Sequence, residues 1–211
     1  MVTPADGAAS SRRDRKKRQT RDALSRAAVR LAAEHGAEHV TVDAISEAAD
    51  VSTRTFFNYF ASKDEAITGH DPTIGAEFRE RVVTAPADLP PLEAIRRALD
   101  GVIAHVEDDR EQWILRMTVI ERSPSLLPRL LSASAADECA LAHVIADRTG
   151  TSVETDSYPS VVAAVTGAVA RVAVTHWATS DRPKPLHTTV DEVFDMLSVG
   201  LVAPTRPRRR R

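Results

Sequence analysis

The sequence predicts an all-α protein, with an N-terminal three-helix helix-turn-helix domain followed by a larger helical domain and about nine or ten helices in total. Three observations support this fold class. Apolar residues recur at spacings of three and four through nearly every segment, as on one face of a helix. Ser, Thr, Gly and Pro stand at the ends of these segments, where they cap or stop helices. Two short segments joined by Asp50-Val51-Ser52 have the lengths and caps of a helix-turn-helix.

The first two helices are defined by their apolar positions and their ends. The first helix is predicted from Thr20 onward and ends at Gly36, a typical C-cap. Its apolar positions are Leu24, Ala27, Ala28, Leu31 and Ala32. Thr41 can cap a second, short helix. The inward positions of that helix are Val42, Ile45, Ala48 and Ala49.

The third helix is predicted from Thr53 to about Phe60, with Ser52 as its N-cap. A helix of barely two turns is not stable alone, so large side chains must fix its inner face. Phe56 and Phe60, four residues apart, are expected to do this. The opposite face is therefore left to Thr53 and other polar or aromatic side chains.

The rest of the chain continues the helical pattern. Ser62 and Glu65, three residues apart, form a capping box that predicts the start of a fourth helix. Further helices are predicted at roughly 73–84, 91–108, 110–122, 125–148, 158–179 and 186–202. The punctuating residues between them are Pro72, Pro90-Pro91, Pro124, Gly150, Pro159, Pro183 and Pro185.

Residues 20–67 contain "AAEHG" and "VTVDAISEAADVSTRTFFNYFASKDEAI", with a fixed order of caps, glycine, turn, aromatic residues and Ser-Lys. This stretch resembles the DNA-binding domain of the tetracycline-repressor (TetR) family. The resemblance implies a homodimer that binds a palindromic double-stranded DNA operator and releases it when a small molecule enters the C-terminal domain. The function implied is transcriptional regulation, most simply repression. A ligand-independent DNA-binding or architectural protein is the alternative.

Four parts of the chain are expected: a disordered basic arm at 1–17, the helix-turn-helix domain at 18–67, a helical ligand-binding and dimerisation domain at 68–203, and a disordered Arg-rich tail at 204–211. Charge is divided unevenly among them. Residues 12–30 hold nine Arg or Lys and two Asp, a net charge of +7, whereas residues 71–204 hold 12 basic and 20 acidic residues, a net charge of -8. This asymmetry predicts that one pole of the molecule meets a polyanion. The basic arm could follow the DNA backbone, enter the minor groove or serve only solubility.

The resemblance implies a set of DNA contacts in the helix-turn-helix. The residues concerned are Thr41, Thr53, Arg54, Thr55, Phe57, Asn58, Tyr59 and Lys63. Thr41, Thr55, Tyr59 and Lys63 match positions that meet phosphates. Thr53 and Arg54 are expected in the major groove, where an arginine can bond two acceptors of a guanine, and Asn58 shares their face.

Phe57 occupies a position that is commonly tyrosine in the family. Without the hydroxyl it cannot make the polar contact. It therefore belongs either to the core or to a contact with a thymine methyl group.

The second domain is expected to bind an apolar or amphipathic effector. Candidate pocket residues are Trp113, Met117, Ile120, Val162 and Thr166. The final segment, "HWATSDRPKPLHTTVDEVFDMLSVGL", resembles a TetR subgroup whose C-terminal domain suits acyl-CoA-like ligands, although another apolar metabolite also fits.

The last two helices resemble the pair that builds the dimer interface of the family. One stripe of the final segment supplies the interface residues Val190, Val193, Phe194, Leu197 and Leu201. Packing within a single chain is the alternative use of this stripe.

The remaining chemistry of the sequence argues against an enzyme. There is no G-x-S-x-G motif and no Gly-rich phosphate loop, so no catalytic residue is expected. The histidines lack metal-ligand spacing, which predicts no metal and no cofactor. A run of 18 apolar residues and an apolar signal region are both missing, so a cytoplasmic protein with no membrane partner is expected. Cys139, the only cysteine, is expected to be a small buried side chain.

Overall fold

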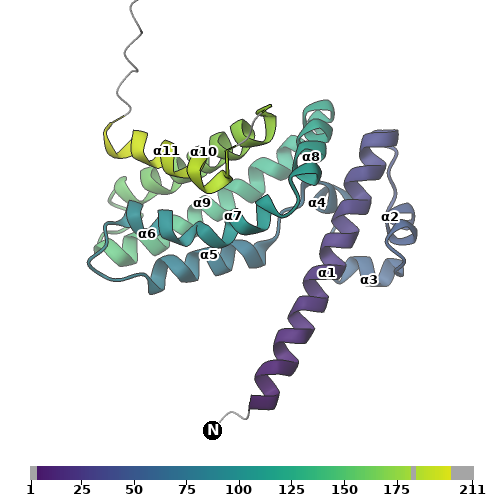
Figure 1. Cartoon of the computed structure of the whole chain (residues 1–211), viewed down its shortest axis with the longest axis horizontal. Helices are drawn as coiled ribbons and strands as arrows, with labels where there is room; N and C mark the ends of the chain where they lie inside the picture. The colour runs from purple at the N-terminus through teal and green to yellow at the C-terminus, as the bar shows by residue number, and fades with distance from the viewer. Residues whose placement is uncertain (1–3, 182–183, 201–211) are drawn as a thin grey trace, which may run out of the picture. The chain divides into compact units, whose positions relative to one another are not determined.

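The computed structural model describes residues 4–181 and 184–200, with side chains from Arg15 onward (Figure 1). Within these ranges it contains the α-helices α1 to α11, one 3-10 turn η1 and no β-strand, so the all-α prediction is confirmed. The chain divides into two compact units. Unit 1 combines residues 1–71 with 111–134, and unit 2 combines residues 72–110 with 135–211.

The helices fall into these units as follows. Unit 1 holds α1 (Pro4–His35), α2 (Val42–Ala48), α3 (Thr53–Phe57), α4 (Lys63–Thr68), most of α8 (Arg110–Arg122), η1 (Pro124–Leu126) and the start of α9 (Leu127–Thr149). Unit 2 holds α5 (Pro72–Thr84), α6 (Pro91–Ala98), α7 (Asp100–Glu107), the rest of α9, α10 (Tyr158–Thr179) and α11 (Leu186–Ser198). The single helix predicted over 91–108 is interrupted at Leu99, which separates α6 from α7.

The N-terminal arm differs from the prediction. Residues 4–17, expected to be disordered, form the first turns of α1. The reason is their composition, because Ala, Arg and Lys are good helix formers and the segment continues directly into an amphipathic helix. Figure 1 shows this part of α1, in purple, extending beyond α2 and α3. Residues 1–3 and the predicted tail at 204–211 lie outside the described residues.

The core of unit 1 fixes the short third helix. Phe56 and Phe60 are 0% and 2% exposed, and their ring centroids lie 5.7 Å apart. They belong to one cluster with Leu24 of α1, Ile45 of α2 and Ile120 of α8. The predicted role of the two phenylalanines is therefore confirmed. Helix α3 itself ends at Phe57, with Asn58 as its C-cap, rather than near Phe60.

Helices α10 and α11 pack together in unit 2. The buried residues of the two helices include Ala173, Trp177, Val190 and Phe194. Arg96 of α6 fastens α11 from the side: its Nε donates to Asp191 Oδ1 at 2.8 Å and its Nη1 to Asp195 Oδ1 at 3.0 Å. The hydrogen bond to Asp191 raises the pKa of Arg96 above its ordinary value.

Two more arginines of unit 2 satisfy carbonyl groups at helix ends. Nη2 of Arg110 donates to the carbonyl oxygens of Ala178 at 2.7 Å and Ser180 at 3.0 Å, at the end of α10. Arg148 of α9 donates to the carbonyl oxygens of Ala85 at 3.1 Å and Leu89 at 3.0 Å, beyond α5. The last carbonyls of a helix have no partner within it, so such caps stabilise the helix end.

Helix α10 is the one described helix that is long and apolar enough to cross a membrane, judged by length and composition alone. Length and composition do not distinguish a membrane-spanning helix from the core helix of a soluble protein, which can have both properties. A third of its apolar window is buried inside the protein. The rest of this window is not buried inside the protein.

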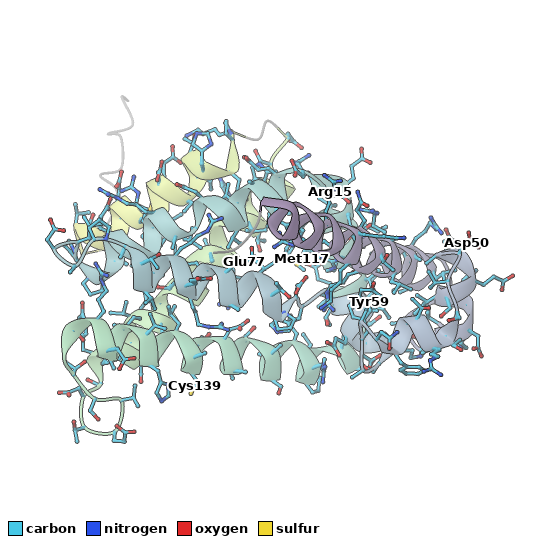
Figure 2. The ribbon with its side chains drawn as sticks, turned by 90° about the horizontal axis from the view of Figure 1, so that it is seen from below. Arg15, Asp50, Tyr59, Glu77, Met117 and Cys139 are labelled. Carbon is cyan, nitrogen blue, oxygen red and sulfur yellow. The ribbon has the colours of Figure 1, made fainter. Side chains whose placement is uncertain are left out.

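Cys139 is exposed, contrary to the expectation that it is buried (Figure 2). It lies one turn after Ala135 and Ala136 on an exposed face of α9. Small residues on that face do not signal which side of the helix packs inward. His143 Nδ1 lies 4.0 Å from the Cys139 sulfur and 2.8 Å from its carbonyl oxygen.

Candidate nucleic-acid interface

The turn between α2 and α3 is closed by backbone and side-chain hydrogen bonds. Asp50 adopts a left-handed conformation with φ of 54°, which Asp tolerates better than most residues. The amide of Val51 donates to the Ser46 carbonyl oxygen at 3.0 Å. Ser52 then caps α3 by accepting from the Thr55 amide at 3.1 Å. The start of α3 is thus fixed relative to α2. Figure 2 shows Asp50 at the edge of unit 1.

The outer face of α3 presents side chains to solvent. Arg54 and Asn58 are exposed, and Thr53 is half-buried in the first turn. Phe57 is 58% exposed, and its ring meets the ring of Phe56 edge-on at 5.4 Å. The core alternative for Phe57 is therefore wrong, because Phe56 and Phe60 already fill the inner side. Contact with a thymine methyl group remains a prediction.

The two threonines and the tyrosine that are predicted to contact phosphates lie in α3 or next to the ends of α2 and α3. Thr41 is exposed and caps α2 by accepting from the Ala44 amide at 3.1 Å, so its hydroxyl hydrogen can still be donated. The Thr55 hydroxyl lies 2.9 Å from the Ser52 hydroxyl. Tyr59 is half-buried just beyond the end of α3.

Lys63 has a structural role that the sequence did not indicate. Its Nζ donates to the carbonyl oxygens of Ala37 at 3.0 Å, Glu38 at 2.9 Å and Val40 at 2.8 Å. These three bonds use every N–H donor of an ammonium group. Lys63 therefore ties the loop between α1 and α2 to the start of α4. A phosphate contact by this residue would have to replace one of these bonds.

We expect Lys63→Met to lower the free energy of unfolding of the protein by about 1.5–3 kcal/mol, because three charge-assisted hydrogen bonds are lost and three carbonyls lose their donor. Urea unfolding followed by circular dichroism measures the change. Lys17→Met, at an exposed position of α1, is the matched control and should be nearly neutral. Unchanged stability of Lys63→Met, together with weaker DNA binding, would assign Lys63 to phosphate contact alone.

Arg21 belongs to the folded unit rather than to the basic arm. Its Nη1 donates to the Tyr59 carbonyl oxygen at 2.5 Å, and its Nε lies 3.2 Å from Asp71 Oδ2. Its guanidinium lies 4.2 Å from the centre of the Phe60 ring. Arg21 thus joins α1 to the segment that follows α3.

A buried arginine of α8 connects to the helix-turn-helix within unit 1. Arg116 is 8% exposed, and it donates to the Ile67 carbonyl oxygen at 3.1 Å and to Ser25 Oγ at 2.9 Å. Ser25 Oγ in turn donates to the Ala66 carbonyl oxygen at 2.8 Å. Gly69, with φ of 72°, leaves room for this guanidinium, since a Cβ there would lie 2.3 Å from Arg116 Cζ. In the sequence, the only visible signals are a serine on an apolar helix face and a glycine after α4.

The residues predicted to bind the effector are divided between the two units. Three of them lie in unit 1 and two lie in unit 2. In unit 1, the Arg116 guanidinium lies 5.5 Å from the Trp113 ring centre, and Met117 packs beside the core. Ile120 is itself a core residue. In unit 2, Val162 is half-buried, and buried Thr166 donates to the Val162 carbonyl oxygen at 2.8 Å. Among the described residues, no group of three or more His, Cys, Asp or Glu side chains is arranged to hold a metal ion.

The predicted dimer stripe on α11 needs correction. Val190 and Phe194 are buried inside unit 2, where they pack between α11 and its neighbours, so they cannot face a second chain. Val193 and Leu197 are half-buried. Leu201 lies outside the described residues. The alternative of packing within a single chain therefore holds for the two most buried members of the stripe.

Both parts of the chain match models of known families. Residues 24–66 match the model described as bacterial regulatory proteins, tetR family. Residues 89–202, more than half of the 211-residue chain, match the MftR C-terminal domain, a TetR C-terminal domain. The chain belongs to the TetR family of transcriptional regulators. The family resemblance seen in the sequence is therefore confirmed, and regulators of this family are not enzymes.

Two relatives extend the match over most of the chain. The HTH-type transcriptional regulator TcmR of Streptomyces glaucescens is 38% identical over 171 residues, which cover 78% of this chain and 76% of TcmR. MftR of Mycobacterium tuberculosis, a transcriptional regulator assigned to mycofactocin biosynthesis, is 30% identical over 191 residues, covering 90% of this chain and 96% of MftR.

The fold also matches solved structures. The TetR-family repressor FadR of Thermus thermophilus, in complex with lauroyl-CoA, aligns with a TM-score of 0.54 and 20% identity. The alignment covers 90% of this chain and 99% of FadR. At this identity the match shows a shared TetR fold.

Proposed function

We propose that this TetR-family regulator is a cytoplasmic repressor that binds a palindromic operator as a homodimer and leaves it when a small apolar or amphipathic effector binds. The exposed outer face of α3 is the observation that carries the proposal. Phe56 and Phe60 hold the helix to the core from inside, while Arg54, Phe57 and Asn58 face outward. A recognition helix that is held in this way is already folded before DNA binds, and it can present side chains to the major groove.

The outer face offers two kinds of base contact. Arg54, in the first turn of α3, can donate two hydrogen bonds to O6 and N7 of a guanine. The exposed ring of Phe57 offers an apolar surface to a thymine methyl group. We therefore expect each operator half-site to contain both a guanine, read by Arg54, and a thymine, read by Phe57.

Arg54→Ala should remove about 1–3 kcal/mol of discrimination between the operator and a scrambled duplex, because a base contact is lost. Binding to the scrambled duplex should change little. Arg30→Ala, which removes an exposed arginine from α1, is the control and should keep the discrimination of the wild type. Fluorescence anisotropy with both duplexes measures the ratio. Equal discrimination by Arg54→Ala and wild type would show that α3 does not read bases through Arg54.

The exposed apolar face of α10 supports dimer formation. Tyr158, Val161 and Val172 lie at helical spacing on this face and are 48%, 55% and 54% exposed. Met196 and Val199 at the end of α11 are exposed as well. Large apolar side chains gathered on one surface mark an interaction site rather than an ordinary solvent face. We therefore place the dimer interface on this face of α10 instead of the buried residues of α11.

FadR of Thermus thermophilus, which shares the fold of this chain, binds lauroyl-CoA. An acyl-CoA is therefore the first effector to test. The chain has two tryptophans, and Trp177 is buried. In Trp177→Phe, the fluorescence therefore reports on Trp113 alone, beside Met117 and Arg116 on α8. The buried contacts of Arg116 with Ser25 and Ile67 connect that helix to the DNA-binding helices.

Titration of Trp177→Phe with lauroyl-CoA should change the Trp113 fluorescence, and operator DNA should weaken this binding by about 5- to 150-fold. The effector and DNA each lower the affinity for the other by the same factor, because their linkage is reciprocal. Coenzyme A without an acyl chain is the control ligand. Equal lauroyl-CoA affinity with and without operator would contradict the release mechanism for this ligand.

A further inference from the structure

Residues 12–18 of α1 are all charged. Residues 12–18 contain six Arg or Lys residues and one acidic residue, Asp14. The side chains from Arg15 to Gln19 are all exposed. The apolar face of α1 begins only at Leu24, which is fully buried. The basic part of the helix therefore has no apolar surface that would hold it to the protein.

This basic segment starts beside the DNA-reading helix. Arg21 contacts the Tyr59 carbonyl oxygen and the Phe60 ring, so α1 leaves the packed core next to the end of α3. A helix rises about 1.5 Å per residue, which places residues 18 to 12 roughly 5–14 Å beyond Arg21 along the helix axis. Figure 1 shows the same projection past α3.

The charges of the segment oppose its own helix. In the sequence, Arg12 and Lys16, Arg13 and Lys17, and Lys17 and Arg21 stand four residues apart, a spacing at which like charges disfavour a helix. Opposite charges stand at the same spacing at Asp14 and Arg18 and at Arg18 and Asp22. A polyanion alongside would relieve the repulsion. Each DNA strand carries a phosphate about every 3.4 Å along the axis, so a segment of this length spans about two or three phosphates.

We propose that the basic segment of α1, at residues 12–18, binds the phosphate backbone of DNA flanking each operator half-site and so lengthens the footprint of the protein. This inference rests on the operator binding proposed above. The contact carries no base information, because phosphates are the same at every sequence. It raises affinity and salt dependence without changing the preferred operator.

The test compares two charge-neutralised proteins on two duplexes. The first variant carries Arg13→Gln, Arg15→Gln, Lys16→Gln and Lys17→Gln, substitutions that keep a good helix former at each position. The matched control carries Arg208→Gln, Arg209→Gln, Arg210→Gln and Arg211→Gln, which remove the same charge from the other end of the chain. One duplex holds only the operator, and the other adds about ten flanking base pairs, or one helical turn, on each side.

On the long duplex, the first variant should bind about 10- to 100-fold more weakly than wild type, and its slope of log affinity against log salt should be smaller by about two or three units per protomer. On the short duplex the two proteins should bind alike. The control variant should behave as wild type on both. Restoring charge with Lys at positions 13 and 15 should recover part of the affinity, which separates a charge effect from a folding defect.

Two results would overturn the inference. One is wild-type protein that binds the long and short duplexes with the same affinity and salt slope. The other is an equal loss in the control variant, which would mean that net charge alone matters. A wild-type protein that binds neither duplex better than scrambled DNA would instead refute the operator binding itself.

Discussion

Phe56→Ala is expected to lower the free energy of unfolding by about 3–5 kcal/mol, the usual cost of removing a fully buried aromatic ring. Phe56 is 0% exposed and contacts the rings of Phe57 and Phe60. Loss of the ring also frees α3 from the core, so operator affinity should fall with the stability. Urea unfolding and anisotropy on the same samples measure both effects.

Phe57→Ala is the matched control for this experiment. It removes an identical ring from the next position, but that ring is 58% exposed, so stability should change by less than about 1 kcal/mol. Base preference in the half-site should change instead. Similar losses of stability in the two variants would contradict the assignment of Phe56 to the inner face and Phe57 to the outer face of α3.

Val172→Asp is expected to dissociate the homodimer while each chain stays folded. Val172 lies on the exposed apolar face of α10, and a charge buried against a second chain without a partner costs several kcal/mol. Operator affinity should fall by more than about 100-fold, because a single half-site gives few contacts. Analytical ultracentrifugation gives the mass of the protein, and circular dichroism gives its helix content.

Two further variants locate the interface. Phe194→Asp puts the same charge into the interior of unit 2, so it should unfold the chain rather than release folded monomers. Ser160→Asp changes an exposed position of α10 outside the apolar stripe and should leave the dimer intact. A folded, dimeric Val172→Asp protein with full operator affinity would place the interface elsewhere.

The helix boundaries could be predicted from the sequence because their signals are local. Ser52 and Ser62 cap α3 and α4 as expected, and Gly36 and Gly69 adopt the left-handed conformation at helix ends. The exception was the N-terminal arm. There, the Ala-, Ser- and Arg-rich composition indicated disorder, whereas helix propensity and continuity with α1 favour a helix.

Partners of long polar side chains could not be predicted, since they depend on which loops and helices meet in space. Lys63 looked like a phosphate contact but binds three carbonyls of a distant loop. Arg116 is buried and donates to Ser25 and to the Ile67 carbonyl oxygen, contacts that no sequence pattern near Arg116 indicates. A periodic pattern gives the spacing of residues on a helix, and burial is decided only by the neighbouring helices.

The same limit explains the error on α11. The stripe through Val190 and Phe194 predicted a packed face correctly but could not indicate whether the partner was another chain or another helix of the same chain. The exposed face of α10 is visible only in the structure, where α11 covers another side of α10. An Ala- and Val-rich helix is apolar on several sides, so its sequence does not distinguish the inward side from the outward one.

If two copies of α3 read a symmetric operator, selection of bound duplexes from a random DNA pool should reveal it. We expect enrichment of a two-fold-symmetric motif, with half-site centres about one helical turn, roughly 34–36 Å, or a multiple of it apart. Arg54→Ala should lose one position from each half of that motif. A pool with no enriched motif, or a motif without two-fold symmetry that Arg54→Ala leaves unchanged, would contradict operator reading by paired α3 helices.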